Sequence, residues 1–412
     1  MKLNVEDYRR AARRVLPRFV FDYIDGAAER GDCLNRNRAD LDRLALMPRV
    51  LRDTSAVDAG IDVFGQRWRQ PFGIAPMGFN GLGRAGGDGM LARAAAAAGV
   101  PFVLSTASNE RLEQVATPGG IHWLQLYVMR DRAIASQLLR RARAAGYQAL
   151  VLTVDVPLSG YRERDVRNGF RLPFRPPLAT LADIALHPRW LLRFLRAGMP
   201  GFVNLAEEEG ADTLQLQAAL LSRELDRALD WDGLAWLRRQ WDGPLLLKGV
   251  LHPADAREAL RRGVDGLIVS NHGGRQLDVA LSAIAALPGV ADAVEGRIPV
   301  FVDSGFRSGA DVAKALALGA RAVFLGRPLL YGLAVDGEAG AGAVLQLVAT
   351  ELERALVLCG ASRVGALERG MVHGLAQGWP GAAGLGALGV QAGEQAGEYA
   401  AAHRKKEEVL QT

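Results

Sequence analysis

Short apolar runs that alternate with helix-forming segments constrain the fold of this chain more than any other feature. Eight such runs follow one another from residue 72 onwards: Phe72–Ala75, Phe102–Ser105, His122–Tyr127, Ala149–Asp155, Leu245–Lys248, Leu267–Asn271, Val300–Asp303 and Ala322–Gly326. The segments between them, such as 90–98, 134–145, 254–262 and 310–318, are rich in Ala, Leu and Arg, which favour helices. Eight strands that alternate with helices predict an α/β fold, a single parallel (β/α)8 TIM barrel.

A doubly wound α/β sheet is the main alternative to a barrel. Such a sheet needs fewer units and usually carries a Gly-rich turn after its first strand. Here the first predicted strand is followed by Ala75-Pro76-Met77-Gly78, which lacks the G-x-G-x-x-G pattern. The sequence therefore favours the barrel.

Two regions flank the repeating pattern of the barrel, which spans residues 71–370. Residues 1–70 are expected to form N-terminal helices, with one continuous helical periodicity from Val5 to Ile24, and then a hairpin at Ile61–Arg69 that closes one mouth of the barrel. Residues 371–412 are rich in Gly and Ala and are expected to form a flexible tail.

An insert at residues 172–241 separates the fourth and fifth predicted strands and is long for a barrel loop. Within it, residues 190–201 combine Trp, Leu, Phe and Met side chains with several arginines, a composition typical of a segment that lies in a membrane interface. The sequence thus predicts a membrane-interacting segment at residues 177–214. A lid over the site or a contact between subunits is the alternative.

Composition excludes several classes of protein. The net charge of +5 is spread along most of the chain, so it does not predict nucleic-acid binding. Cys33 and Cys359 are the only cysteines, too few for a disulfide framework, and no Cys/His spacing predicts a metal site. The N-terminus lacks the apolar stretch of a signal peptide, and no run reaches the roughly 18 uncharged apolar residues of a spanning helix. A cytoplasmic protein is therefore expected.

Polar or glycine-containing turns follow nearly every predicted strand, at the end where barrels of this type carry their active sites. The candidate site residues read off the strand ends are Ala75, Pro76, Gly78, Ser105, Gln125, Tyr127, Thr153, Asp155, Lys248, Ser270, His272, Arg275, Asp303, Arg307, Gly326 and Arg327. Among them, His272 takes a proton near neutral pH, and Arg275 binds a carboxylate through two parallel hydrogen bonds. The two glycines between them would let the backbone approach a ligand closely.

Several of these residues have a plainer interpretation when taken alone. His272 and Arg275 could belong to an ordinary polar loop, and Asp155 could be a helix cap. Lys248 could reach out of the barrel end into water. Against this, the chain has only five lysines beside forty-five arginines, so a lysine that ends an apolar strand indicates that a compact charge is needed there.

The loops after the seventh and eighth predicted strands point to a phosphate-bearing ligand. They contain Gly305, Arg307, Gly326 and Arg327, and barrels commonly bind phosphate at these two loops through backbone N–H groups and a helix start. An exposed cluster of ion pairs is the alternative.

The run Ser270–Asp278, S-N-H-G-G-R-Q-L-D, resembles the FMN-dependent α-hydroxy-acid oxidoreductases. Four further runs carry the same likeness, which covers about residues 8–363: 75–81, 103–109, 160–165 and 187–190. Within the family the nearest likeness is to the (S)-mandelate dehydrogenases. The resemblance implies that the chain oxidises an (S)-2-hydroxy acid to a 2-keto acid while FMN is reduced.

The resemblance also assigns roles to individual residues. His272 would be the general base, and Asp155 would support its imidazolium. Tyr127 would hydrogen-bond near the reacting carbon, and Lys248 would lie at the N1/O2 edge of the flavin and favour the anionic reduced ring. The residues that would bind the substrate carboxylate are Arg275, Arg162 and Tyr23.

Further residues would hold the flavin by the same resemblance. Those implied to line the isoalloxazine ring are Ala75, Pro76, Met77, Ser105, Gln125, Thr153 and Ser270. Asp303 would hold the ribityl chain, and those implied to hold the phosphate are Gly305, Arg307, Gly326 and Arg327.

Gly78 bears on the size of the substrate, because many members of the family with short substrates carry Ala there. A missing methyl group beside the flavin would make room for a bulky or aromatic acid such as mandelate, although one such change discriminates by only ~1–3 kcal/mol. Met77 departs from the Thr of the mandelate-oxidising members. Oxidation of L-lactate, or use of oxygen as the oxidant, are the alternatives within the family.

The resemblance further implies partners. Electrons would pass to a membrane quinone, with the protein held peripherally at the inner face of the cell membrane and assembled as a homotetramer. Two alternative functions lie outside the hydroxy-acid oxidoreductases. One is a flavin-free barrel isomerase or lyase that acts on a phosphorylated substrate, and the other is a barrel that binds flavin without turnover.

Overall fold

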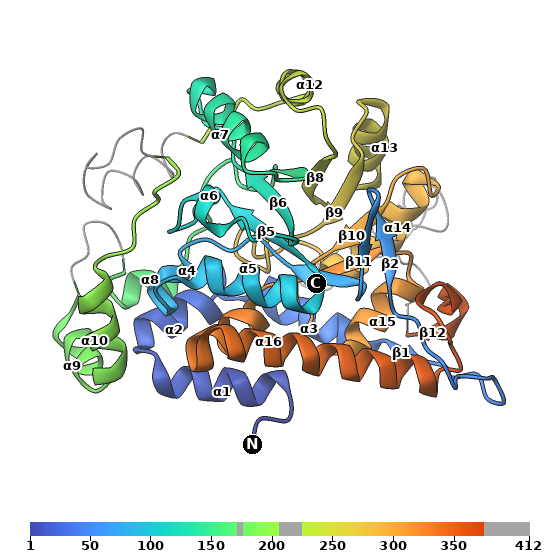
Figure 1. The fold of residues 1–412 in the computed structure, drawn as a ribbon, viewed down its shortest axis with the longest axis horizontal. Coiled ribbons are helices and arrows are strands. Elements are labelled where there is room, and N and C mark those ends of the chain that lie inside the picture. The colour runs from blue at the N-terminus through green and yellow to red at the C-terminus, as the bar shows by residue number, and fades with distance from the viewer. Residues whose placement is uncertain (171–175, 206–224, 375–412) are drawn as a thin grey trace, which may run out of the picture. The chain divides into compact units, whose positions relative to one another are not determined.

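The computed structural model describes residues 1–170, 176–205 and 225–374, and in them eight parallel strands close into a barrel (Figure 1). The barrel strands are β4 (Phe72–Ile74), β5 (Pro101–Ser105), β6 (Ile121–Leu126), β7 (Ala149–Thr153), β8 (Leu245–Val250), β9 (Gly266–Val269), β10 (Val300–Val302) and β11 (Ala322–Leu325). They pair in chain order, and β11 pairs with β4 through Val323 and Phe72. The predicted TIM barrel is confirmed, and a doubly wound sheet is excluded because its edges would be open.

Helices follow the strands and surround the barrel (Figure 1). The helices that follow barrel strands are α4 (Asn80–Gly83), α5 (Gly87–Ala98), α6 (Leu112–Val115), α7 (Arg132–Ala144), α8 (Glu163–Arg167), α12 (Trp231–Gln240), α13 (Pro253–Arg261), α14 (Ala283–Val294), α15 (Gly309–Ala317) and α16 (Arg327–Leu358). Because helices cover the outside and side chains fill the inside, the strands are buried on both faces and read as continuous apolar runs.

Aromatic side chains fill the end of the barrel at which the strands begin. The hairpin of β2 (Ile61–Val63) and β3 (Gln66–Trp68) carries fully buried Trp68 into this end. The ring of Trp68 lies 5.4 Å from that of Trp123 and 6.0 Å from that of Phe301. The hairpin therefore closes this mouth, as predicted, and the opposite mouth is left for the site.

The N-terminal segment forms two helices where one continuous helix was predicted. α1 (Val5–Val15) and α2 (Arg18–Asp25) are separated at Leu16 and Pro17, where Leu16 has extended backbone angles. Proline disfavours the helical conformation of the residue before it and has no N–H to continue the ladder. The apolar periodicity runs across this break, so periodicity alone missed it. A third helix, α3 (Asp32–Arg43), follows.

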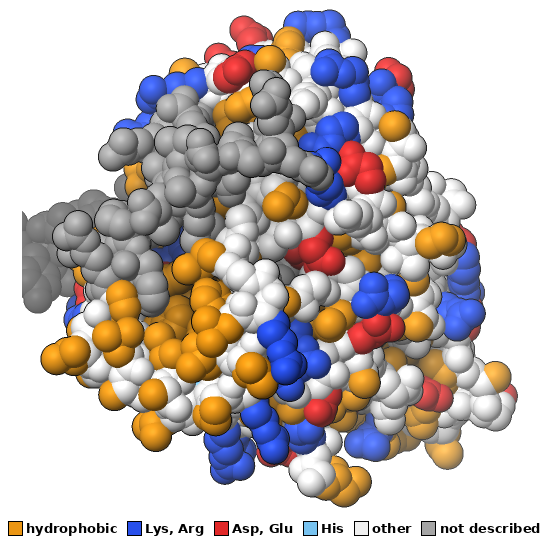
Figure 2. Space-filling view, turned by 60° about the vertical axis from the view of Figure 1, so that its left-hand side comes forward, with side chains coloured by type: hydrophobic (Ala, Val, Ile, Leu, Met, Phe, Trp, Pro, Cys, Tyr) orange, Lys and Arg blue, Asp and Glu red, His pale blue; other side chains and the backbone are white. Residues whose placement is uncertain are grey.

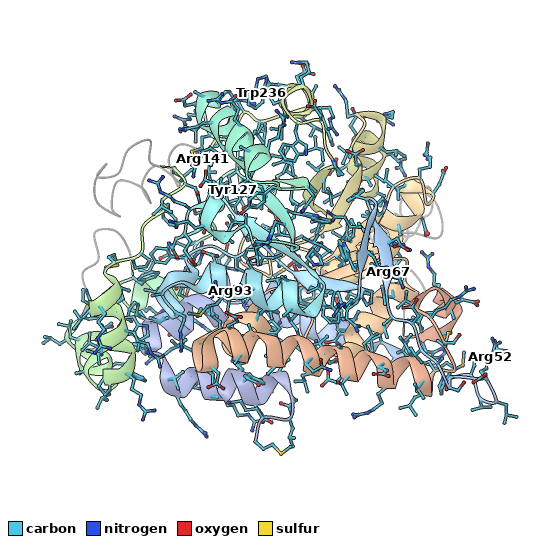
Figure 3. The ribbon with its side chains drawn as sticks, in the orientation of Figure 1. Arg52, Arg67, Arg93, Tyr127, Arg141 and Trp236 are labelled. Carbon is cyan, nitrogen blue, oxygen red and sulfur yellow. The ribbon has the colours of Figure 1, made fainter. Side chains whose placement is uncertain are left out.

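The insert after β7 is partly a regular element of the barrel. Its described portion contains α9 (Leu178–Ala185), α10 (Pro188–Ala197) and α12, and α12 is the helix that precedes β8. The guanidinium of Arg132 on α7 lies 4.9 Å over the ring of Trp236 on α12, a residue labelled in Figure 3. The range predicted as an insert thus includes a barrel helix. No helix among the described residues is long and apolar enough to cross a membrane.

The C-terminal part of the described chain pairs with a strand of the N-terminal region. α16 is interrupted at Asp336 and Gly337, whose backbone angles are not helical. The short helices Val364–Ala366 and Arg369–Met371 lead to β12 (Val372–His373), which pairs with β1 (Ala45–Leu46). Part of the region predicted as a tail from residue 371 therefore forms a strand, and residues 375–412 lie outside the described part of the chain.

A buried carboxylate joins the loops that follow β4 and β5. Asp88, in the first turn of α5, accepts hydrogen bonds from Asn80 Nδ2 at 2.6 Å and from Ser108 Oγ at 2.7 Å. Asn80 Nδ2 also donates to Met77 O at 3.0 Å. Asp88 is only 1% exposed, and burial raises its pKa to about 6 although these hydrogen bonds oppose the shift. Asp88 thus ties two loops of the functional mouth together.

The raised pKa of Asp88 predicts a pH-dependent contribution to stability. The folded chain binds the proton more strongly than the unfolded chain, so the contribution is complete below about pH 4 and is lost as the pH rises to about 6. Asn cannot titrate, so Asp88→Asn should not show this loss. Between pH 4 and 7 we expect the wild type to lose on the order of 3 kcal/mol more free energy of unfolding than Asp88→Asn does. Urea unfolding at several pH values measures this.

The exposed helix cap Asp131 provides the control, because Asp131→Asn removes a carboxylate without changing the buried network. Its pH dependence should match that of the wild type. If Asp88→Asn also matches the wild type, then the hydrogen bonds hold Asp88 at an ordinary pKa.

Candidate active site

A cavity of about 740 Å³ lies at the mouth where the barrel strands end. The predicted site residues that line it are Tyr23, Ala75, Pro76, Met77, Gly78, Ser105, Tyr127, Arg162, Lys248, His272, Arg275, Asp303, Gly305, Arg307, Gly326 and Arg327. The remaining four, Gln125, Thr153, Asp155 and Ser270, are at or just beyond strand ends and do not line the cavity wall. The structure thus brings most of the predicted residues to one space.

A left-handed turn after β9 presents His272 to this cavity. His272, Gly273 and Gly274 have φ values of 59°, 67° and 73°. The N–H of His272 donates to Ser270 Oγ at 3.0 Å, which helps to hold this uncommon backbone. A Cβ on Gly274 would lie 2.6 Å from the backbone nitrogen of Leu34. Gly274 therefore allows close packing against α3 rather than the predicted approach to a ligand, whereas Gly273 does line the cavity.

His272 lies between a carboxylate and a phenol. Its Nδ1 is 3.0 Å from Asp155 Oδ1, and its Nε2 is 3.4 Å from the hydroxyl of Tyr127, which follows β6 and is labelled in Figure 3. An Nδ1–H that donates to Asp155 leaves Nε2 free to accept a proton. Burial would raise the pKa of Asp155, but His272 and Lys248 outweigh it and the pKa is lowered. Asp155 is thus the charged partner that an imidazolium needs.

A buried ion pair lies beside this group. Lys248 Nζ is 3.0 Å from Asp303 Oδ2 and donates to Ser270 Oγ at 2.9 Å. Burial would lower the pKa of Lys248, but Asp303 and Asp155 raise it above its ordinary value. Lys248 is therefore a permanent cation at the cavity wall and does not reach out into water.

Two guanidinium groups face the ring of Tyr23. Arg275 and Arg162 lie 5.1 and 5.6 Å from its centroid, and the hydroxyl of Tyr23 donates to Gly78 O at 3.3 Å. Burial lowers the pKa of Arg275 to about 10, and Arg162 adds to this shift. Two cations that share a confined space favour an anion between them. This is the arrangement that a carboxylate requires.

The loops after β10 and β11 form the predicted phosphate region. Ser304 and Gly305 have φ values of 79° and 95°, and Arg307 Nη1 donates to Phe306 O at 2.9 Å. Arg327 begins α16 but is bonded elsewhere, because its Nε and Nη2 donate to backbone carbonyls of α2 and the turn after it. Only its Nη1 side is directed to Gly273 and the cavity.

Polar atoms of the site without partners test whether FMN fits. Among the described residues, Gln125 Nε2 and Thr153 Oγ1 are buried and have no hydrogen-bond partner. Buried donors and hydroxyls are normally paired, so these two atoms leave unmet hydrogen-bonding capacity at strand ends just behind the cavity wall. An isoalloxazine ring carries carbonyl oxygens and ring nitrogens along one edge. Lys248 on β8 pairs in register with Thr153 on β7, so the two residues lie side by side at neighbouring strand ends. The residues fit the group.

Sequence reasoning missed further residues of the site, and Ser304, Gln276 and Phe170 are three of them. Ser304 Oγ donates to Asp303 Oδ1 at 2.8 Å and accepts from Gly273 N at 3.0 Å. Gln276 Nε2 donates to Asp155 O at 3.0 Å, and it could have been found because it follows Arg275 in the same run. Phe170 lines the cavity from just before the insert, where nothing in the sequence indicated it.

Comparisons with known proteins show which family the chain belongs to. Residues 12–374 match the family described as FMN-dependent dehydrogenase. The chain belongs to this family: it is an FMN-dependent oxidoreductase that acts on CH–OH groups, and its cofactor is FMN. When bound, FMN supplies the acceptor for two electrons.

Individual members of the family are similar to this chain over most of its length. The chain is 46% identical to (S)-mandelate dehydrogenase of Pseudomonas putida over 87% of its own length and 90% of the relative's. It is 44% identical to L-lactate dehydrogenase of Ectopseudomonas mendocina (strain ymp) over 87% and 95% of the two chains. A solved structure described as monotopic membrane protein (S)-mandelate dehydrogenase superimposes with a TM-score of 0.87 at 43% identity, covering 90% of this chain and 99% of that one.

The contact between His272 and Asp155 predicts the effect of removing one charge. Asp155→Asn keeps the size of the side chain but no longer stabilises an imidazolium, so we expect kcat/KM to fall by about 10²-fold or more. The bound flavin should remain, because Asp155 does not line the cavity. Steady-state kinetics together with the flavin absorbance of the purified variant measure both quantities.

The exposed Asp242 offers a control, and Asp242→Asn should behave as the wild type. Wild-type kcat/KM in Asp155→Asn would show that His272 does not depend on this carboxylate.

Proposed function

We propose that the chain oxidises an (S)-2-hydroxy acid with an aromatic side chain, with mandelate as the representative substrate, and passes the electrons to a membrane quinone. The observation that carries the substrate is an aromatic wall beside the two cavity arginines. The rings of Tyr23 and Phe170 lie 5.4 Å apart, and Phe79 lies 6.0 Å from Tyr23 and 5.3 Å from Phe202. Aromatic pairs at such distances also accept a further ring at their edge or face.

The residues of the mouth perform the chemistry together. Arg275 and Arg162 bind the carboxylate, which places the carbon that bears the hydroxyl near His272. Nε2 of His272 accepts the proton released in the oxidation, and Asp155 stabilises the resulting imidazolium. Lys248 supplies a positive charge where the reduced cofactor gains negative charge. The oxidation removes two electrons and two protons from the acid and leaves the 2-keto acid. His272 takes one proton, and bound FMN would take the two electrons together with the second proton.

Gly78 supports the proposal, but a side chain at this position would contact Ala107 and not occupy free space beside the flavin as predicted. A Cβ on Gly78 would lie 2.8 Å from the Cβ of Ala107 and 3.4 Å from its carbonyl oxygen. A methyl group at this position would therefore push the Met77–Gly78 turn away from Ala107, so residue 78 affects the width of the cavity by moving the turn.

Oxidation of L-lactate is the second candidate. It is favoured by the 44% identity to an L-lactate dehydrogenase, which nearly equals the identity to the mandelate enzyme. The same arginines and His272 would bind the carboxylate and hydroxyl of either acid. Only the space beyond the hydroxyl-bearing carbon differs, and that space is bounded by the aromatic wall.

A substrate series tests the proposal directly. Anaerobic addition of mandelate to the purified holoenzyme should bleach the flavin absorbance, and kcat/KM should follow the order mandelate, lactate, glycolate. A higher kcat/KM for lactate than for mandelate would replace the first candidate by the second. A protein that binds flavin but is bleached by none of the three acids would refute both.

The aromatic wall provides the matching variant. Phe170→Ala removes one ring, and we expect kcat/KM for mandelate to fall by about 10–200-fold, the range for losing apolar contacts at a substrate. The value for lactate should change by less than about threefold, because lactate does not reach this wall. Equal losses for the two acids would show that Phe170 shapes the site as a whole.

Exposed apolar and basic side chains on α9 and α10 support membrane association. Leu178, Leu186 and Leu192 are 84%, 79% and 50% exposed. Arg189, Arg193 and Arg196 are exposed on the same helices, and Figure 2 shows hydrophobic side chains gathered on this side of the molecule with basic side chains nearby. Such helices lie in a membrane interface. The similar structure described as a monotopic membrane protein points the same way.

Removal of the exposed leucines should weaken the association. The triple variant Leu178→Ser, Leu186→Ser, Leu192→Ser is expected to lower the partition coefficient onto vesicles with anionic lipid by at least about tenfold, since each buried leucine contributes about 1.5–3 kcal/mol. Sedimentation with vesicles measures the bound fraction.

The control is Leu358→Ser, on α16, where Leu358 is 67% exposed but lies outside the insert. Equal binding by the triple variant and the wild type would place the membrane contact elsewhere on the chain.

A further inference from the structure

The C-terminal turn of α2 holds two of the arginines that line the cavity, Arg275 and Arg327. Arg275 Nη1 donates to Tyr23 O at 2.7 Å and to Gly26 O at 3.2 Å. Arg327 Nε donates to Ile24 O at 3.1 Å, and its Nη2 donates to Gly26 O at 2.6 Å. The carbonyl oxygen of Gly26 therefore binds two different arginines at once.

These carbonyl groups replace carboxylates as partners. Among the described residues, neither Arg275 nor Arg327 is within ion-pair distance of an acidic side chain. Burial lowers the pKa of Arg275 to about 10 and that of Arg327 to about 9. The carbonyl end of a helix carries partial negative charge and stabilises nearby cations. The two arginines are thus aimed and kept charged by α2, yet remain uncompensated until an anion binds.

One carboxylate fixes this turn in place. Asp25, the last residue of α2, is only 6% exposed and accepts two hydrogen bonds from Arg9 of α1, at 2.7 Å from Nε and 2.8 Å from Nη2. It also accepts a hydrogen bond from the hydroxyl of Tyr331 at 2.7 Å. Tyr331 follows Arg327 by four residues on α16, so the two side chains lie on one face of that helix. Asp25 therefore joins α2 to both α1 and α16.

We propose that Asp25 is a positioning residue that holds the carbonyl turn of α2, and that this turn sets the positions of Arg275 and Arg327 for the substrate carboxylate and the cofactor phosphate. The carbonyl oxygen of Gly26, which bonds both arginines, is the point at which the turn acts on the two together. This inference rests on the proposed roles of Arg275 and Arg327 in binding those two anions.

The test uses Asp25→Asn in the full-length holoenzyme. The amide removes the charge and turns one acceptor into a donor, so the bidentate contact with Arg9 is lost, while Arg9 is 39% exposed in its side chain and can be hydrated. We expect both the Kd for FMN and the KM for the 2-hydroxy acid to rise by about tenfold. The value of kcat should stay within about twofold, since Asp25 touches no reacting atom.

Two readouts do not depend on turnover. Release of FMN is followed by the recovery of free flavin fluorescence on dilution, and binding of the keto-acid product is followed by the change in flavin absorbance. The substrate used is the acid that the wild type oxidises best. An error in the choice between mandelate and lactate is therefore detected with the wild type, before any variant is compared. Loss of wild-type turnover with every acid would overturn the proposed function, whereas the positioning role of Asp25 is judged on the two binding constants.

Two further variants separate positioning from general damage. Tyr331→Phe removes one hydrogen bond to Asp25 and should shift both constants in the same direction by a smaller factor, and it carries the test if Asp25→Asn does not fold. Asp22→Asn, one turn earlier on α2 and bonded to Asn168, should leave both constants unchanged. Unchanged constants in Asp25→Asn, a fall in kcat alone, or equal effects from Asp22→Asn would overturn the proposal.

Discussion

Charge held away from water at one rim of the barrel governs how the rest of the site is built. Lys248 and Asp303 have side chains only 4% and 9% exposed, and each would be strongly destabilising without the other. His272 and Asp155 form a second pair beside them, at 3.0 Å. A parallel barrel brings every strand end to the same rim, so these groups meet without long loops. The aromatic plug at the opposite end leaves this rim as the place where a ligand can enter.

Two arginines of the site, Arg275 and Arg327, have backbone carbonyls rather than carboxylates as partners. The carbonyls of α2 orient these arginines but do not neutralise them. A carboxylate in that place would neutralise these cations. The helix end thus leaves two uncompensated cations at the cavity wall, and Asp25, one layer behind it, bonds the helix end to α1 and α16.

Much of the fold and many of the site residues could be predicted, because a strand buried on both faces reads as an apolar run and its polar end is visible at once. All eight strands were located to within a few residues. The break at Pro17 was missed because apolar periodicity continues across it, and α12 was assigned to the insert because a helix between strands has no mark that separates it from inserted sequence. Ser304, Gln276 and Phe170 were missed because their roles depend on contacts with distant loops.

The sequence by itself determined the fold class and the end of the barrel at which His272, Lys248 and Arg275 lie together in one cavity. These follow from local patterns of burial and chain direction. Only the tertiary structure decided the partners of Arg275 and Lys248: Arg275 donates to the carbonyl of Tyr23, 252 positions away, and Lys248 forms its ion pair with Asp303 beyond the intervening strand β9. Such partners depend on how helices pack against the closed barrel, and hydrogen bonds within about 3 Å cannot be read from spacing along the chain.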